Sequence, residues 1–163
     1  MISERMEKML LNDVDTLIKP VDELAVIAAD HSLDHALLLM TKNKYSLVPV
    51  LGKDSKMKGM ISLALIIEAI IGIEDVYFDQ LNKIKVHEAM ETDYPSVSEE
   101  YELEKVSRLL VRHPFVSVVD KEGILLGIIT RQEILRGTNR ILHNFEKVYQ
   151  VEDRSTKVDI LSS

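Results

Sequence analysis

The chain has 163 residues and a net charge of −7, from 27 acidic and 20 basic residues. This balance argues against non-specific binding to nucleic acid or anionic membranes, which depends on clustered lysine and arginine. The absence of cysteine excludes disulfides, thiolate metal sites and cysteine nucleophiles. Charged residues interrupt the N-terminal region, and no apolar run approaches the ~18 residues of a membrane span. We therefore expect a cytoplasmic protein without a signal peptide.

The first predicted elements form a β-α-β-β-α unit, after a short helical lead-in over residues 1–18. Apolar residues at 24–28 predict a buried strand, and Asp30 or Ser32 can cap the helix that follows. Two further strands, joined by a polar turn, lead to a second helix that Gly72 ends. These later elements are predicted as a helix that includes residues 33–40, strands 46–51 and 57–61, and helix 63–71.

A connector over residues 72–85 is expected to pack against the protein through Val76, Phe78, Leu81 and Ile84. The same order of elements then repeats. The repeated elements are predicted as strand 96–97, helix 103–111, strands 115–119 and 125–129, and a helix beginning at Arg131.

The C-terminal region is predicted to extend this last helix. Ile141, Phe145 and Tyr149 recur at four-residue spacing, which is typical of an amphipathic helix. Residues 150–163 are polar with few apolar positions, and we expect them to form a loosely held tail.

Two short motifs occur twice in the same order. Residues 48–51 (VPVL) and 59–62 (GMIS) are separated by a polar loop, as are residues 117–120 (SVVD) and 127–130 (GIIT). A self-similar unit of this length predicts two equivalent halves that are packed together.

Doubled in this way, the pattern resembles the tandem cystathionine-β-synthase-type module, or CBS pair. The resemblance is carried by residues 45–50 (YSLVPV) and 115–120 (FVSVVD), each followed by a glycine motif. It implies an α+β fold of two β-α-β-β-α halves related by pseudo-twofold symmetry. The domains it implies are a first CBS domain at 14–72, a second at 86–137, and a helical extension and polar tail at 138–163.

CBS pairs also dimerise through their helices, and the resemblance implies a homodimer. The apolar residues Ile66, Ile67, Ile70 and Ile71 are consistent with a helix-lined dimer face.

The resemblance further implies that an adenosine binds in the cleft between the halves. The purine would contact the first strand and the YSLVPV strand of one half, and the ribose and phosphate would face a helix start of the other. The residues placed there are Leu24, Ala25, Tyr45, Ser46, Leu47 and Pro49 on the purine side, and Thr130, Arg131, Gln132 and Glu133 on the phosphate side.

The residue types on the purine side fit an adenine, which needs flat apolar walls. Ala25 is small enough for a ring to approach the backbone, and Pro49 within a strand suits an edge or a pocket lip. Leu24 and Leu47 have an equally good explanation as core residues.

On the phosphate side, Thr130 begins a helix, whose free N–H groups and dipole favour an anion. Arg131 offers a bidentate fork to a phosphate, although it could also be a solvated surface residue. Glu133 could hold ribose hydroxyls or complete a capping box with Thr130. The first half carries SLAL at residues 62–65 in the same place, without an arginine or a carboxylate, so one cleft is expected to bind nucleotide and the other to be filled or idle.

Residues 1–3 (MIS), 35–38 (HALL) and 40–42 (MTK), with the Thr130–Arg131 step, further resemble the stand-alone bacterial CBS-pair proteins that bind cyclic di-AMP. That resemblance implies a regulator whose ligand-free form docks on a partner, with the (p)ppGpp synthetase and pyruvate carboxylase as candidates. Relatives in this subgroup tend to carry a second arginine where this chain has Gln132. Two alternatives stay open: a CBS-pair sensor of AMP, ADP, ATP or S-adenosylmethionine, and a structural dimerisation module without a ligand.

Few titratable residues are spaced for catalysis. His31 and His35 could share a helix face, but a metal site would need a third ligand and an orienting shell. The sequence has no P-loop, nucleophile elbow or HExxH motif. We therefore expect no enzymatic activity, no metal and no cofactor.

Overall fold

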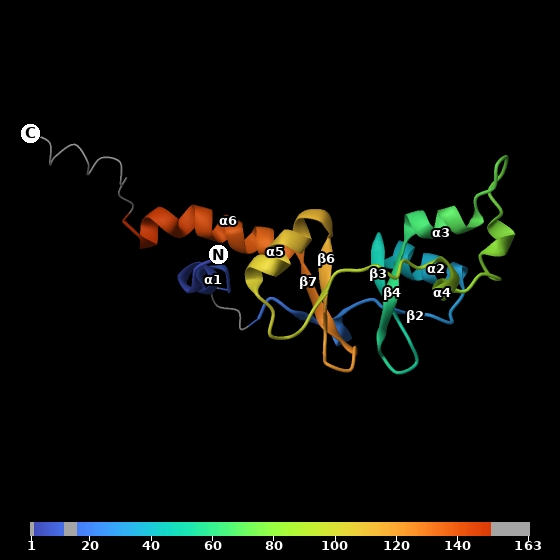
Figure 1. Ribbon diagram of the computed structural model, residues 1–163. Helices are drawn as coiled ribbons and strands as arrows, with labels where there is room; N and C mark the ends of the chain where they lie inside the picture. Colours follow the sequence, from blue (N-terminus) through green and yellow to red (C-terminus); the bar gives the residue numbers. More distant parts are fainter. Residues whose placement is uncertain (1, 12–15, 151–163) are drawn as a thin grey trace, which may run out of the picture.

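The computed structural model describes residues 2–11 and 16–150 and forms two units joined side by side (Figure 1). The predicted lead-in helix spans Glu4–Leu11, whereas residues 12–15, including the expected start of the first domain at Val14, lie outside the described part. The first unit has the predicted order of elements. It consists of β2 (Ile27–Ala28), α2 (Leu33–Asn43), β3 (Leu47–Leu51), β4 (Met57–Ser62) and α3 (Leu63–Ile70).

The second unit repeats this order, and short elements connect the two. It consists of β5 (Ser96–Val97), α5 (Leu103–Arg112), β6 (Phe115–Val119), β7 (Leu125–Thr130) and α6 (Arg131–Val148). The remaining elements are α1 (Glu4–Leu11), β1 (Lys19–Pro20), the 3-10 turns η1 (Val21–Glu23) and η2 (Phe78–Gln80), and α4 (Val86–Ala89).

The two units match in strand register as well as in order. Val50 lies opposite Gly59 in the first hairpin, and Val118 lies opposite Gly127 in the second. Each hairpin has a bulge directly after that pair. The pseudo-twofold α+β architecture predicted from the repeat is therefore confirmed.

The chain crosses between the units twice, and the motif glycines make both crossings possible. β1 pairs with β7 of the second unit, and Glu91 forms a bridge with Met60 of the first. A Cβ on Gly127 would lie 2.3 Å from the carbonyl oxygen of Lys19, and one on Gly59 would lie 2.5 Å from that of Glu91. The repeated glycine therefore allows another strand to approach the hairpin closely.

Three hydrophobic clusters hold the molecule together. One lies within each unit, between its sheet and its helices. The third joins the two sheets and draws on both units; its buried members are Met57, Met60, Phe115, Leu125 and Ile128. We call this third cluster the inter-sheet core.

Two predicted segments differ from the structure. The strand expected at 24–28 is paired only at Ile27–Ala28, because the 3-10 turn η1 precedes it and the Leu24 N–H donates to the Val21 carbonyl oxygen. In the connector, Leu81 is buried and Val76 and Ile84 pack beside it, as expected, but Phe78 is 64% exposed.

The expected dimer face on α3 is partly wrong. Ile66 and Ile70 are fully buried in the core of the first unit, because they lie on the side of α3 that faces the sheet. Only Ile67 and Ile71 are exposed, at 38% and 56%.

The terminal helices pack on each other at one end of the molecule. α6 continues without a break past residue 137, where the second domain was expected to end. Gly137 allows close contact with α1, since a Cβ there would lie 3.0 Å from the Leu10 carbonyl oxygen. No helix in the described part of the chain is long and apolar enough to cross a membrane. The predicted loose tail, residues 150–163, lies outside the described residues except for Gln150.

Candidate functional site

A cavity of about 530 Å³ opens between the two units and collects nine of the ten predicted site residues. We call it the inter-domain cavity. The first unit contributes one wall and the second unit the other. The predicted residues that line it are Leu24, Ala25, Tyr45, Ser46, Leu47, Pro49, Thr130, Arg131 and Gln132.

The wall from the first unit is apolar along β3 and the segment before β2. Leu24 and Leu47 line the cavity and also pack against the inter-sheet core, so their position is compatible with either role. Tyr45 stands at the rim, 40% exposed, two residues before the start of β3. This wall offers flat apolar surface to a planar ligand.

Pro49 is tolerated in the middle of β3 because no strand partner needs its N–H. Its opposite residue, Met60, directs its N–H and carbonyl to Glu91 instead, at 2.8 Å each. On the other side, pairing with β2 begins only at Val50.

The proline also leaves a backbone acceptor free. In the second unit the Ser117 N–H donates to the Pro95 carbonyl oxygen at 3.0 Å. The register makes Pro49 the counterpart of Ser117 and Ala25 the counterpart of Pro95. Since Pro49 has no N–H, the Ala25 carbonyl oxygen accepts no hydrogen bond from the described residues.

The wall from the second unit is the start of α6. The Thr130 hydroxyl caps this helix by accepting a hydrogen bond from the Glu133 N–H at 3.2 Å. A helix N-terminus carries unpaired N–H groups and a positive partial charge, so this wall favours an anion.

The Arg131 side chain is held by carbonyl groups at the C-terminal end of α5. Its Nε donates to the Leu110 carbonyl oxygen at 2.7 Å, and Nη2 lies 3.5 Å from that of Val111, both in the last turn of α5. A guanidinium has five N–H groups, and Nη1 makes no hydrogen bond to the described residues. The α5 carbonyls therefore fix one edge of the guanidinium while donors remain for a ligand.

Glu133 is the predicted site residue that the structure does not bring into this cavity. Its carboxylate pairs with Arg136, one turn along α6, and lines a neighbouring hollow. The expected capping box is only half formed, because the hydroxyl of Thr130 caps the helix but Glu133 does not reach back.

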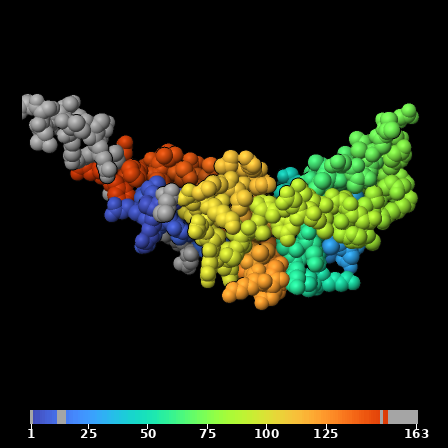
Figure 2. Space-filling view, viewed as in Figure 1, coloured from blue at the N-terminus to red at the C-terminus, as the bar shows by residue number. Residues whose placement is uncertain are grey.

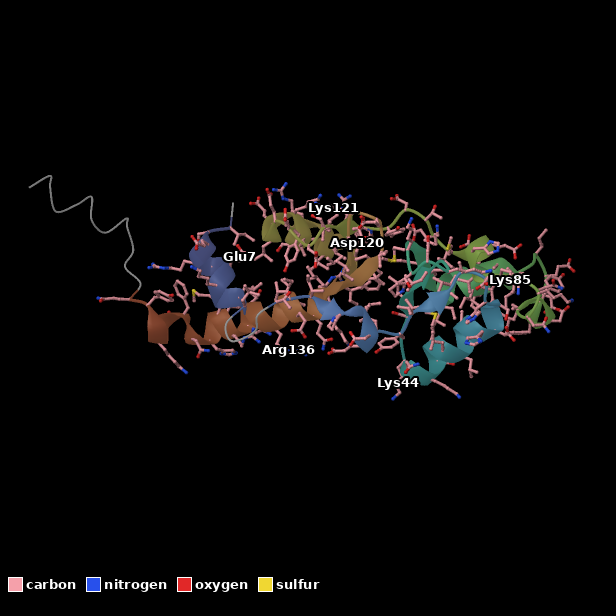
Figure 3. The ribbon with its side chains drawn as sticks, turned by 90° about the horizontal axis from the view of Figure 1, so that it is seen from below. Glu7, Lys44, Lys85, Asp120, Lys121 and Arg136 are labelled. Atoms are coloured by element: carbon pink, nitrogen blue, oxygen red, sulfur yellow. The ribbon has the colours of Figure 1, made fainter. Side chains whose placement is uncertain are left out.

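Two lysines that sequence reasoning missed also line the cavity. Lys19 comes from β1, and Lys44 ends α2 in a left-handed conformation, with φ of 57° and ψ of 33°. Figure 3 shows Lys44 at the end of α2, at the edge of the molecule. With Arg131 the cavity is lined by three cations and no carboxylate, although the chain carries a net charge of −7.

The counterpart cleft differs at the equivalent positions. Ser62 caps α3 through a 3.1 Å hydrogen bond from Leu65, with no arginine after it. Tyr94 stands where the first unit has Leu24; its ring packs against the inter-sheet core and its hydroxyl donates to the Met57 carbonyl oxygen at 3.1 Å. Burial raises the pKa of Tyr94. The larger side chain takes space that stays open in the inter-domain cavity.

A sequence-family comparison matches the CBS domain over residues 14–72 and 86–138. The chain is a CBS-domain protein. Among curated relatives of this CBS pair, cyclic di-AMP receptor B of Bacillus subtilis is 31% identical over 147 residues, which cover 90% of this chain and all of that protein.

Solved structures of CbpB proteins are also similar to this CBS pair. CbpB from Streptococcus agalactiae is 28% identical, with a TM-score of 0.80, over 94% of this chain and 96% of that one. CbpB from Listeria monocytogenes in complex with c-di-AMP is 39% identical, with a TM-score of 0.74, over 77% of this chain and 94% of that one.

The described residues hold no group of three or more histidine, aspartate or glutamate side chains placed to bind a metal. The rings of His31 and His35 lie 4.4 Å apart at the start of α2, without a third candidate ligand.

Proposed function

We propose that this CBS pair binds cyclic di-AMP in the inter-domain cavity and regulates a partner protein without catalysing a reaction. The observation that carries the proposal is the composition of the cavity, with an apolar wall from one unit and a cationic helix start from the other. The relatives that bear the name of the ligand support the same choice.

The apolar wall binds one adenine of the ligand. Its ring can lie against Leu24, Leu47 and Pro49, with Tyr45 at the rim. The amino group on the adenine edge is a hydrogen-bond donor, and the free Ala25 carbonyl oxygen is an acceptor beside it. A buried acceptor with a complementary donor discriminates adenine from a base that lacks this amino group.

The cationic side chains of the cavity bind the two phosphates of the ligand. Arg131 and the N–H groups at the start of α6 hold one of them through charge-assisted hydrogen bonds. Gln132 brings no charge, but Lys19 and Lys44 supply the positive charge for the second phosphate. Glu133 is engaged by Arg136, which favours a ligand recognised through its phosphates over one recognised through a carboxylate on its ribose.

The signal passes to another protein. The ligand must favour the conformation or assembly that binds the partner less well, since a ligand shifts an equilibrium only through its differential affinity. The resemblance suggests the (p)ppGpp synthetase and pyruvate carboxylase as partners of a cytoplasmic homodimer that needs no cofactor.

Thermal unfolding with single nucleotides tests this function. Cyclic di-AMP at one hundred times its dissociation constant stabilises the protein by about 2.7 kcal/mol, a rise in Tm of roughly 5–11 °C. Arg131→Ala should abolish the rise, whereas Arg112→Ala, an exposed arginine in the last turn of α5, should keep it. The same pair of variants in a pull-down with each candidate partner tests whether ligand releases it.

The other outcomes decide between the alternatives. A rise with AMP or ATP alone would identify a mononucleotide sensor. No shift with any nucleotide would leave a structural dimerisation module.

A further inference from the structure

A pocket lies between α1 and α6, at the end of the molecule away from the first unit (Figure 2). We call it the terminal pocket; its volume of about 640 Å³ is in the range of small-molecule sites. It shares no lining residue with the inter-domain cavity. A ligand in the terminal pocket is therefore a second one, and its binding does not rest on the proposed function.

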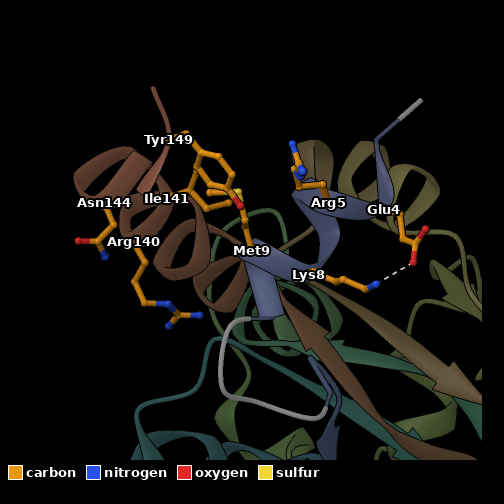
Figure 4. A pocket seen from close by; sticks show the side chains of 8 residues that line it. All are labelled: Glu4, Arg5, Lys8, Met9, Arg140, Ile141, Asn144 and Tyr149. Carbon is orange, nitrogen blue, oxygen red and sulfur yellow. Dashed lines mark hydrogen bonds and ion pairs between the residues drawn. The ribbon is translucent and has the colours of Figure 1, made fainter. Parts of the chain in front are cut away.

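The apolar part of the terminal pocket comes from both helices. Figure 4 shows Met9 of α1 pointing toward Ile141 of α6 and toward Tyr149 at the end of that helix. Met9 and Ile141 are half-buried, and Ile141 also packs against the core of the second unit. These side chains form an apolar surface against which the body of a small ligand can pack.

Cations surround this apolar surface. The lining carries three basic residues, Arg5, Lys8 and Arg140. The one carboxylate among the lining residues, Glu4, pairs with Lys8 at 2.8 Å. The Arg5 guanidinium carbon lies 5.6 Å from the centre of the Tyr149 ring, and within the described residues no carboxylate pairs with either arginine. Two uncompensated arginines, in a chain with a net charge of −7, indicate an anionic ligand.

Arg140 has fewer acceptors than its guanidinium can use. Its Nη2 donates to the Leu10 carbonyl oxygen at 3.1 Å, whereas its buried Nε has no partner in the described part of the chain. A guanidinium carries five N–H groups, and a buried donor without an acceptor destabilises the folded protein. An anion in the terminal pocket supplies oxygen acceptors that the surrounding backbone does not.

We propose that the terminal pocket binds a small organic phosphate, with its phosphoryl oxygens on the two arginines and its apolar body against Met9 and Ile141. A phosphate monoester carries up to two negative charges near neutral pH, which matches the two arginines. Its oxygens also fit the planar fork of a guanidinium, which binds phosphate through paired hydrogen bonds. Because Arg5 and Arg140 belong to different helices, the bound phosphate holds α1 against α6.

Methyl NMR of the full chain, labelled at methionine, tests the site with phenyl phosphate as the probe. The Arg131→Ala variant is used, so that the inter-domain cavity does not contribute. The Met9 methyl signal, assigned from Met9→Leu, should shift with a dissociation constant on the order of 1 mM, as expected for a ligand of this size. The signals of Met57 and Met60, buried in the inter-sheet core, should stay in place.

Matched substitutions assign the contacts. Arg140→Gln and Arg5→Gln should each raise this dissociation constant roughly tenfold, because a charge-assisted contact is lost. Arg112→Gln, at an exposed arginine of α5 outside the pocket, should leave it unchanged. Inorganic phosphate, which has no apolar body, should bind more weakly than phenyl phosphate. Benzyl alcohol, which has no charge, should leave the Met9 signal in place.

Hydrogen exchange measured by mass spectrometry gives a second, independent readout. α1 has eight residues, too few for a stable helix without tertiary packing. Phenyl phosphate should therefore slow amide exchange in α1 and leave exchange in α2 unchanged. Unchanged exchange in α1 would show that the probe does not bridge the two helices.

Three results would overturn the proposal. They are a Met9 signal that does not move with phenyl phosphate, equal affinities in the two pocket variants and in Arg112→Gln, and inorganic phosphate that binds as tightly as phenyl phosphate. Circular dichroism of each variant establishes that its fold is intact before the affinities are compared.

Discussion

Among residues 2–11 and 16–150, two residues other than glycine adopt a left-handed backbone, and one of them lines the inter-domain cavity. Lys44 has φ of 57° and Ser55 has φ of 61°. This conformation costs roughly 1–2 kcal/mol for a residue with a Cβ. At Lys44 it ends α2, with the Lys44 N–H donating to Met40 and Thr41, and it brings the lysine to the rim of the cavity.

Replacing each residue with glycine separates stability from binding. Lys44→Gly should raise the free energy of unfolding by about 0.5–1 kcal/mol, because glycine relieves the strain but has more entropy to lose. Ser55→Gly should raise it by a similar amount. Only Lys44→Gly should lower the affinity for cyclic di-AMP, by roughly three- to tenfold, because one cation of the cavity is lost. Urea unfolding measures the free energy of unfolding, and calorimetric titration measures the affinity for cyclic di-AMP. Equal affinities in both variants would show that Lys44 does not contact the ligand.

At the scale of elements, the two β-β-α motifs share a frame but differ in chemistry. Thr130 and Ser62 cap equivalent helices through the same hydrogen bond. Only α6 continues with an arginine, and only its start lines the inter-domain cavity. The hydroxyl cap therefore stabilises a helix in both units, and we expect it to contribute to ligand binding in the second unit alone.

Removing each cap should expose this difference. Thr130→Ala and Ser62→Ala should each lower the free energy of unfolding by about 1 kcal/mol, the usual value of a side-chain cap. Nucleotide affinity should fall in Thr130→Ala and stay unchanged in Ser62→Ala. A loss of affinity in both variants would mean that both clefts bind nucleotide.

Element prediction from the sequence was accurate where the pattern is local. The hairpin strands and long helices follow apolar periodicity, and their bounds agree with the structure to within a few residues. The strand at 24–28 was too long, because η1 uses the preceding backbone. Ile66 and Ile70 were placed on a surface, because periodicity does not tell which side of an all-apolar helix faces the sheet.

At the scale of the whole molecule, the inter-sheet core packs the two units against each other, and we expect them to unfold as one cooperative unit. Met57 and Met60 come from the first unit, and Phe115, Leu125 and Ile128 from the second. Hydrogen bonds between the hairpins, from Met57 to Gly123 and from Leu125 to Ser55, reinforce the junction. The inter-domain cavity depends on this junction, because each unit supplies one wall.

Leu125→Ala and Leu110→Ala test this cooperativity with the same change in side chain. Both leucines are buried, and each substitution should cost about 2–5 kcal/mol. Leu125 belongs to the inter-sheet core, so its loss should split or broaden the transition; Leu110 lies within the second unit, so its loss should lower Tm only. Calorimetry measures the ratio of van't Hoff to calorimetric enthalpy. An unchanged ratio in Leu125→Ala would show that the units couple by another route.

The fold and nine of the ten predicted site residues could be predicted from the sequence alone, because the repeat and the motifs that carry the resemblance to CBS pairs are properties of the chain itself. The tertiary structure decided what depends on residues far apart. It brought Lys19 across to β7, turned Lys44 to the cavity, paired Glu133 with Arg136 and left the Ala25 carbonyl oxygen free. These features follow from how distant segments pack, and no local pattern encodes that packing.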